Sequence, residues 1–446
     1  MAMAVISTDV ISTIHINKKT KLENKLFTHT SIIGTNHINK LNMYQNELIP
    51  GLPNDIGLEC LLRVPITSHP TLRLVSHLWK TTLSHPSFFS LRRHTDAAEH
   101  LVFLVQPLFP PPPPPPQQQV HQTKEDVQEL GVKESDEFSN PLRYNLSVYN
   151  STRHEWRNLV NIAIPTFAQC VAVPAVGKVV VLGGWDPATL IPDTRVIVID
   201  FVSGIWKEGS PMPTARSFFA CVAVGSAAVY VAGGHDGRKN ALRTAEAYDV
   251  EADTWRVLPE MAEERDESHG VVFGSNFWVV SGYGTESQGR FRPDAEIYDP
   301  ETSTWTRIDG VWPYSGHTPK STMVAAAPVG QRPRWWCMNG GELKQFDFED
   351  NSWRGLKTGR IPESVNGSTS ISLVDIGDNR VMVMGNGEKC GEECKEEMCG
   401  GEGVFMVEKS NNNNNNKMEG INWKWEHVHA PSNFLGLPFS SSHLLI

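Results

Sequence analysis

The sequence contains no run of 18 apolar residues, so we expect no transmembrane helix in its 446 residues. Its N-terminus also lacks the continuous apolar core of a secretory signal. Acidic residues outnumber basic ones, and the formal net charge of −10 argues against binding to nucleic-acid phosphates as the main activity. The seven cysteines are odd in number, and Cys170, Cys221 and Cys337 lie in strand-like segments. They are typical of small hydrophobic residues in a reducing compartment, which leaves the cytoplasm and the nucleus open.

A unit of about 50 residues recurs along the chain, and each copy ends in a tryptophan strand. Asp or Asn, preceded by an aromatic or apolar residue, stands six positions before each tryptophan, and the tryptophans recur every 48 to 50 positions. They are Trp156, Trp206, Trp255, Trp305 and Trp353. Self-similarity at this period indicates stacked supersecondary units.

Each unit repeats the same order of segments. An alternating apolar segment leads to a second apolar run that ends in glycine, as in residues 179–184 and 229–234. A polar loop, a strand ending in Tyr-Asp, a short turn and the tryptophan strand follow. Four short β-rich runs separated by Gly, Asp and Pro predict one antiparallel four-stranded sheet. Because a lone sheet of this size cannot bury both faces, the sheets must stack face to face.

The Gly-Gly, Tyr-Asp and Trp residues at this spacing resemble kelch repeats over roughly residues 144–430, and the resemblance implies a β-propeller. Full units are expected at about 164–209, 213–260, 263–309, 316–357 and 363–429. Residues 144–159 hold only the last two strands of a further unit. We expect residues 101–105 to supply its second strand and residues 440–446 its inner strand. Pairing of the last strand with this first unit would close the ring as six blades and remove both sheet edges.

Residues 47–93 follow a helical pattern instead. Leu52-Pro53 and the polar residues after it are a helix start signal, Pro65 ends this first helix, and a second helix is expected from about Thr71. About 45 residues are too few for an independent core, so the apolar stripes must be covered by the propeller or by another protein.

This segment resembles an F-box, from Leu52-Pro53 through residues 61–64 to Trp79. The resemblance implies binding to the Skp-type adaptor of a cullin-RING ubiquitin ligase. The residues expected to bind the adaptor are Leu52, Pro53, Ile56, Leu58, Leu61, Leu62, Val64, Leu72, Val75 and Trp79. The alternative is a helical cap packed on the propeller.

The predicted fold is therefore mainly β: a six-bladed kelch β-propeller preceded by a small α-helical F-box. Residues 1–46 are expected to be a disordered N-terminal tail, with a targeting peptide or a translation start at Met43 as alternatives. The F-box follows at 47–93. Residues 94–143 are a connector with the first-blade strand and a run of seven prolines (110–116), and 144–446 form the propeller closed by the C-terminal strand.

The loops before each inner strand and after each glycine pair must lie on one rim of the propeller, because the strands of each blade are antiparallel. Arg and aromatic residues on loops of a rigid scaffold suit protein recognition. Phe167 and Glu286 belong to this rim. The residues expected to bind a target protein are Trp185, Asp186, Arg216, His235, Asp236, Arg238, Lys239, Arg265, Tyr283, Arg290 and His317.

The sequence gives little evidence for a catalytic site or a metal site. Glu263, Asp266 and His269 could form a metal triad, as in plant kelch proteins that redirect glucosinolate breakdown, but their spacing differs and an acidic loop explains them equally well. The cysteines between Cys390 and Cys399 lack a matching His or second Cys pair for zinc. We expect no catalytic residues, no cofactor and no metal.

The F-box and kelch repeats together resemble the plant F-box/kelch-repeat proteins. This implies a non-catalytic substrate receptor of an SCF ubiquitin ligase, which binds the Skp-type adaptor and a target protein but neither nucleic acid nor membrane. Residues 48–53 and 233–238 resemble the branch that recruits phenylalanine ammonia-lyase, which would make the protein a negative regulator of phenylpropanoid synthesis; other members of that branch recruit response regulators. The alternatives are a kelch scaffold outside any ligase and a metal-dependent specifier.

Overall fold

The computed structural model describes residues 47–108, 143–159, 163–320, 322–326, 334–366, 368, 370–385, 403–409 and 423–446. The chain divides into two compact units, Met1–Ala97 and Ala98–Ile446. The expected N-terminal tail, the proline-rich insertion, the Cys390–Cys399 segment and the asparagine run at 411–416 lie outside the described residues. Within the part of the chain that is described, no helix is both long enough and apolar enough to cross a membrane.

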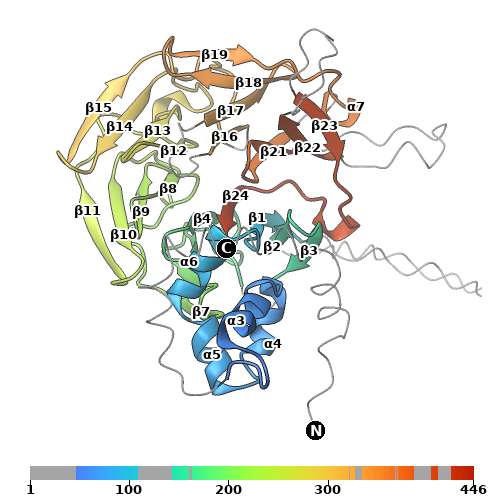
Figure 1. The fold of residues 1–446 in the computed structure, drawn as a ribbon. Helices are drawn as coiled ribbons and strands as arrows, with labels where there is room; N and C mark the ends of the chain where they lie inside the picture. The colour runs from blue at the N-terminus through green and yellow to red at the C-terminus, as the bar shows by residue number, and fades with distance from the viewer. Residues whose placement is uncertain are drawn as a thin grey trace, which may run out of the picture. The chain divides into compact units, whose positions relative to one another are not determined.

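The first unit is helical (Figure 1). Its elements are α3 (Asn54–Leu62), the 3-10 turn η1 (Ile66–Ser68), α4 (His69–Leu72), α5 (His77–Leu83) and α6 (Pro86–His94). The predicted single helix from about Thr71 is wrong, because the chain breaks between α4 and α5. The Ser76 side chain accepts a hydrogen bond from the Trp79 backbone N–H at 3.1 Å and so caps a new helix.

The helical unit buries several of its apolar residues through its own contacts. The ring of Phe88 lies 5.7 Å from His69 and 5.6 Å from Phe89. The buried Arg92 guanidinium donates to the carbonyl oxygens of Leu62 and Val64, at 2.6 and 2.7 Å, and thereby ties α6 to the end of α3. The expectation that this segment must take its core from elsewhere is therefore too strong.

The second unit consists of six four-stranded antiparallel sheets arranged around an axis (Figure 1), which confirms the predicted six-bladed propeller. The first three complete sheets hold β4 (Gln169–Val173), β5 (Lys178–Leu182), β6 (Val196–Asp200), β7 (Ile205–Glu208); β8 (Ala220–Val224), β9 (Ala228–Ala232), β10 (Ala245–Asp249), β11 (Thr254–Leu258); and β12 (His269–Phe273), β13 (Asn276–Val280), β14 (Ala295–Asp299), β15 (Thr304–Ile308). A short 3-10 turn, η2 (Thr285–Ser287), lies between β13 and β14.

The remaining sheets follow the same order. Their strands are β16 (Met323–Ala326), β17 (Arg334–Asn339), β18 (Glu342–Asp347), β19 (Ser352–Gly355); β20 (Ile371–Asp375), β21 (Arg380–Gly385), β22 (Gly403–Lys409), β23 (Trp423–His427); and β1 (His100–Pro107), β2 (Tyr144–Asn150), β3 (Glu155–Asn158), β24 (Ser440–Leu445). The short helices α7 (Glu363–Asn366) and η3 (Ser432–Phe434) lie in the connections.

The last sheet closes the ring as predicted, in the order β24-β1-β2-β3. β24 pairs with β1 along its length, with Phe103 opposite Ser442. The hydroxyl groups of Ser440 and Ser442 accept hydrogen bonds from the backbone of Cys170 and Ala172, at 2.9 and 2.7 Å. The C-terminal strand therefore joins one sheet by its ladder and the next by its side chains.

Four of the five tryptophans that define the repeat link neighbouring blades, whereas Trp206 is 44% exposed. Trp255 stacks on Tyr248 of its own sheet, with 4.9 Å between the ring centroids. Its indole N–H donates to the Ser210 carbonyl of the preceding blade at 2.8 Å. Trp156, Trp305 and Trp353 make the same bond to His429, Pro259 and Val311. One polar atom on a large apolar ring thus fixes the spacing of adjacent sheets, which explains its recurrence.

A cluster of histidines and carboxylates lies at the seam where the ring closes. His100 Nδ1 is 2.9 Å from His443 Nε2, and His100 Nε2 is 3.0 Å from Asp378 Oδ2. His443 Nδ1 faces Asp375 Oδ2 at 3.6 Å. Burial raises the pKa of Asp375 from its ordinary 3.8 to about 7 and lowers the pKa of His443 to about 3. The folded state therefore favours the uncharged forms of Asp375 and His443 over an ion pair.

This seam predicts that Asp375→Asn stabilises the protein at alkaline pH. The folded-state pKa of Asp375 is raised, so its contribution to stability is present below pH 3.8 and is lost as the pH rises through about 7. Asn cannot ionise, and its oxygen can still accept from the Gly377 N–H as Asp375 does. We expect a gain of about 1 kcal/mol or more at pH 8 that shrinks toward pH 5, measured by denaturant unfolding.

Asp378→Asn is the matched control, because its side chain is on the same turn but 71% exposed. The positive charges of Arg334 and Arg380 act against the rise in pKa and are present in both variants. Lower stability of Asp375→Asn at pH 8 would show that the seam holds an ionised carboxylate instead.

Candidate functional site

The loops before the inner strands meet the loops after the second strands at one end of the propeller. Isolated bridges join Thr166 to Trp185, Ser217 to His235, and Asp266 to Tyr283. We call this surface the loop face; it comprises residues 165–168, 183–195, 216–219, 233–244, 265–268 and 282–294, together with Phe439 before β24. Gly282 is needed here, since it has φ of +86° and a Cβ would lie 2.7 Å from the Asp266 carbonyl oxygen.

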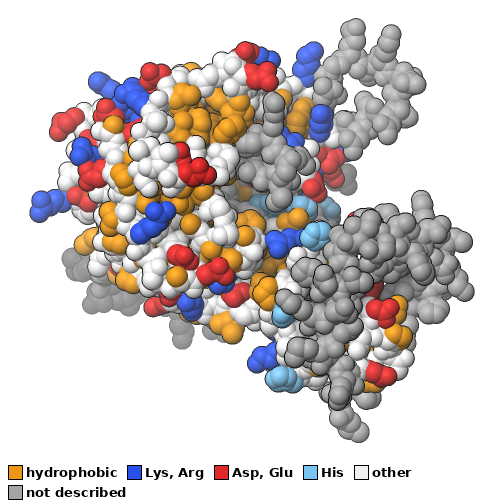
Figure 2. Space-filling view, turned by 60° about the vertical axis from the view of Figure 1, so that its left-hand side comes forward, with side chains coloured by type: hydrophobic (Ala, Val, Ile, Leu, Met, Phe, Trp, Pro, Cys, Tyr) orange, Lys and Arg blue, Asp and Glu red, His pale blue; other side chains and the backbone are white. Residues whose placement is uncertain are grey.

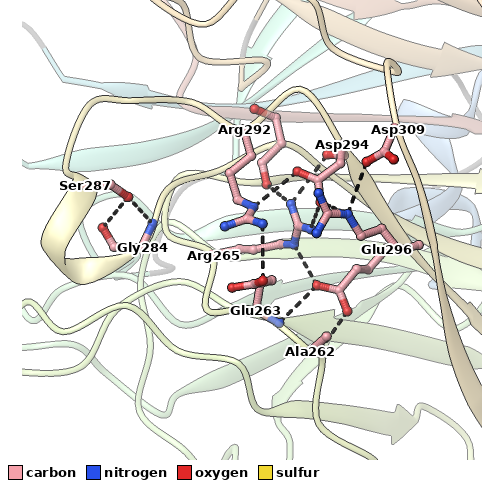
Figure 3. A network of polar contacts seen from close by, with 11 residues as sticks. Ala262, Glu263, Arg265, Gly284, Ser287, Arg292, Asp294, Glu296 and Asp309 are labelled. Atoms are coloured by element: carbon pink, nitrogen blue, oxygen red, sulfur yellow. Dashed lines mark hydrogen bonds and ion pairs between the residues drawn. The ribbon is translucent and has the colours of Figure 1, made fainter.

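Arg216 and Arg265 were expected to bind a target protein, but both side chains are fully buried. Their role is therefore structural. Arg265 bonds Asp294 at 2.8 Å and Glu296 at 3.1 Å, and it donates to the Ser281 carbonyl at 2.8 Å (Figure 3). Each guanidinium fastens the loop that precedes an inner strand to the start of the third strand of the same blade.

Arg216 makes the equivalent bonds one blade earlier, to Glu246 at 3.1 Å and to the carbonyl groups of Gly233 and Thr244. An exposed arginine and an arginine that spans two loops look alike in the sequence, because both stand in polar loops. The sequence did contain one signal for burial of these arginines: each has a glutamate, Glu246 or Glu296, in the third strand of its own unit.

The centre of the loop face holds an aromatic cluster: Phe167, Trp185, Phe218 and Phe439. The rings of Phe167, Phe218 and Phe439 lie 5.0 to 5.1 Å apart, and Trp185 lies 5.2 Å from Phe167. All four side chains are partly exposed. Phe218 and Phe439 were missed by the sequence analysis, although Phe167 and Phe218 stand two residues before the inner strands of successive units.

His235 connects this cluster to an acidic group. Its ring stacks on Phe218 at 5.4 Å, and its Nδ1 lies 3.0 Å from both oxygens of Asp266. The Trp185 indole N–H points at His235 Nε2 at 3.3 Å, so His235 accepts there and donates from Nδ1. The ammonium of Lys239 lies 3.3 Å from the centre of the Trp185 ring, in a cation–π contact.

Lys320 and Glu267 are the charged residues beside the aromatic cluster and the His235–Asp266 pair. The buried Lys320 ammonium donates to the Phe219 carbonyl at 3.1 Å and lies 5.0 Å from the Phe439 ring. Burial lowers the pKa of Lys320 to about 8 and raises the pKa of Glu267 above its usual range. Tyr283 donates its hydroxyl hydrogen to Glu267 at 3.0 Å. The charged groups of Lys320 and Glu267 are therefore both hydrogen-bonded within the fold.

The expected target-binding residues thus fall into three groups. The exposed ones are Arg238, Lys239, Arg290 and His317; the half-buried ones are Trp185, Asp186 and Asp236; the buried ones are His235, Tyr283, Arg216 and Arg265. Figure 2 shows hydrophobic side chains bordered by charges of both signs on the face of the molecule that it draws.

The expected adaptor-binding residues divide in the same way. The exposed ones are Pro53, Ile56 and Val75; the half-buried ones are Leu52, Leu58, Val64 and Leu72; the buried ones are Leu61, Leu62 and Trp79. The Trp79 indole N–H donates to the Leu48 carbonyl at 2.6 Å, so this side chain serves the fold. Leu74, 86% exposed, was not among the expected residues and now joins Ile56 (45%) and Val75 (59%).

Glu263, Asp266 and His269 do not form the metal triad considered from the sequence. Glu263 pairs with Arg292 at 3.3 Å, Asp266 with His235, and His269 begins β12. Among the described residues, no group of three or more His, Cys, Asp or Glu side chains could hold a metal ion.

Removal of the buried guanidinium should be far more damaging than removal of an exposed one. Arg265→Ala leaves Asp294 with Arg292 and Arg307 but leaves the buried Glu296 without its cation, so we expect a loss of about 3–5 kcal/mol in the free energy of unfolding. Arg290→Ala, exposed on the next loop, should stay within about 0.5 kcal/mol of the wild type. Denaturant unfolding of both variants measures the difference, and equal effects would remove the structural role of Arg265.

Comparison with known proteins agrees with both units. The chain matches the family models of the F-box domain at residues 49–91 and of the Kelch motif at 215–262. It is 41% identical to the F-box/kelch-repeat protein SKIP20 of Arabidopsis thaliana, over 90% of this chain and 97% of that protein. It is 39% identical to the F-box/kelch-repeat protein At2g44130 of the same plant, over 90% and 96% of the two chains. A third, At1g80440, is 32% identical over 77% and 89%.

Proposed function

The chain belongs to the F-box/kelch-repeat proteins, and we propose that it is the substrate-recognition subunit of an SCF ubiquitin ligase. The F-box binds the Skp-type adaptor, and the propeller binds a target protein that the ligase marks for proteasomal degradation. Ubiquitin transfer belongs to other subunits, so this chain contributes proximity and no chemistry. The observation that carries the proposal is the presence in one chain of an F-box with exposed apolar residues and a kelch propeller with a partly exposed aromatic cluster.

The exposed apolar residues of the helical unit support adaptor binding. Ile56 lies on α3, and Leu74 and Val75 lie in the break before α5. The unit buries Leu61 and Leu62, so the exposure of the other three is not a general lack of packing. Apolar side chains left on the surface of a folded unit mark an interaction site when they lie together, and the F-box is the part of this family that binds the adaptor.

Replacement of exposed F-box residues should weaken adaptor binding without unfolding the protein. We expect Ile56→Asp with Val75→Asp to lower the affinity for the Skp-type adaptor by about tenfold or more, because each change puts a charge into an apolar interface. Calorimetry with the purified adaptor measures this. Val257→Asp is the control, since Val257 is 75% exposed on β11 of the propeller. Unchanged adaptor binding in the double variant would favour the alternative of a scaffold outside the ligase.

The target that we propose is phenylalanine ammonia-lyase, which would make the protein a negative regulator of phenylpropanoid synthesis in the cytoplasm, the nucleus or both. The support is the resemblance of residues 48–53 and 233–238 to the branch that recruits this enzyme. Residues 233–238 run from the glycine pair through His235 to the exposed Arg238, so part of that resemblance lies on the loop face. A response regulator is the alternative target.

Expression of the protein in plant cells should shorten the half-life of phenylalanine ammonia-lyase. A form without residues 47–93 should bind the enzyme but leave its half-life unchanged, because the ligase is no longer recruited. A cycloheximide chase with and without proteasome inhibition measures both. A stable ammonia-lyase together with a destabilised response regulator would move the target to the alternative.

A further inference from the structure

We propose that the aromatic cluster and the cations beside it form one docking site, and that its occupant is a linear acidic segment of the target with an aromatic or aliphatic anchor residue. The inference rests on the proposed function and specifies where and how the target is held. The anchor would pack on the exposed surfaces of Phe167, Phe218 and Phe439, and the flanking carboxylates would reach Arg238, Lys239 and Arg290.

Two of the phenylalanines occupy a loop position that has a left-handed backbone conformation in three successive units, with Glu267 (φ 50°) at the third. Phe167 and Phe218 both have φ of 58°, in the left-handed region. For a bulky residue this conformation costs about 1–2 kcal/mol, and glycine or asparagine would adopt it with less strain. Yet two successive units place a partly exposed phenylalanine there. Strained residues with exposed rings are a recurring property of ligand sites.

The aromatic cluster suits an apolar anchor. Three rings from the loops before β4, β8 and β24 have centroids about 5 Å apart, so they pack against one another and present one continuous apolar surface. Below them, Lys320 is bonded to a backbone carbonyl, and Glu267 to the Tyr283 hydroxyl. When an apolar group covers this surface, the rigid aromatic side chains lose little conformational entropy, and the polar groups that are already hydrogen-bonded lose little hydration.

The charges that remain free around the cluster favour acidic neighbours of the anchor. Asp186 is half-buried, and its Oδ1 accepts from the backbone N–H groups of Ala188 and Thr189, at 3.0 and 2.8 Å, within its own loop. Asp236 likewise accepts from the backbone of Arg238 and Asn240, at 2.8 and 2.9 Å.

By contrast, Arg238, Lys239 and Arg290 are exposed, and none of them forms an ion pair with a described carboxylate. Glu286 is the one exposed carboxylate among the described loop-face residues. A basic segment would therefore meet one exposed carboxylate on the loop face, whereas an acidic one meets three exposed cations that are not paired with a described carboxylate.

A phage-displayed library of random 12-residue peptides, selected on the full-length protein in complex with the Skp-type adaptor, tests the chemistry directly. The proposal expects enriched peptides with an aromatic or aliphatic residue next to Asp or Glu. A basic consensus, an uncharged consensus or no enrichment over the unselected library would overturn it. Adaptor binding is measured in the same preparation: adaptor binding without peptide enrichment overturns only the docking site, and enrichment without adaptor binding overturns only the ligase role.

Variants then locate the site with a synthetic peptide of the enriched sequence. Phe218→Gly and Phe218→Asn should each weaken its binding by about tenfold or more, while the melting temperature stays close to that of the wild type, because the φ strain is relieved. Trp206→Ala is the control, as Trp206 is 44% exposed on the outer strand β7. If either Phe218 variant folds and binds the peptide with the affinity of the wild type, Phe218 does not hold the anchor residue of the peptide.

The contribution of charge is tested on one loop. Lys239→Ala with Arg238→Ala should weaken peptide binding and reduce its dependence on salt, because two partners for carboxylates are lost. Arg243→Ala is the matched control, since this exposed arginine of the same loop is already paired with Glu260 at 2.6 Å. If the control weakens binding as much as the double variant, the effect is one of net charge and the specific site is refuted.

Discussion

Closure of the ring by the C-terminal strand is the constraint on which the rest of the propeller depends. β24 pairs with β1, more than 330 residues away along the chain. The first and last strands of the propeller therefore belong to one sheet. Without this pairing, β1 would present an open edge at the centre of the molecule. The same strand carries Phe439 just before it, so closure also brings the third phenylalanine to the loop face. Fold completion and assembly of the candidate site are therefore one event.

The loop face owes its geometry to buried charges. Arg216 and Arg265 each bind backbone carbonyl groups at the end of one strand and a carboxylate on the next, so the loops between are held at both ends. A buried ion pair adds little net stability by itself, because desolvation offsets much of the attraction. Its value here is positional, since it fixes loops that otherwise contain few apolar residues. The strained Phe218 lies two residues from one of these anchors.

The helical unit shows how burial separates two roles within one short motif. Leu61 and Leu62 end α3 and are covered within the folded chain, whereas Ile56, one and a half turns earlier, is exposed. The exposed apolar residues of the break before α5 add a second group. A partner can therefore bind this unit without first completing its core.

The repeat period alone determined the blades, the identity of the closing strand and the place of the tryptophans, because these features follow from local pattern and from the need to leave no open edge. The F-box was recognisable from its Leu-Pro start and its spacing. The break at Ser76, the burial of Arg216 and Arg265, and the meeting of Phe167, Phe218 and Phe439 were decided only by tertiary structure. These features join residues from different blades or depend on whether a side chain turns inward, and a linear pattern records neither property. Whether a loop arginine spans two strands or faces solvent depends on which carboxylate lies across the turn.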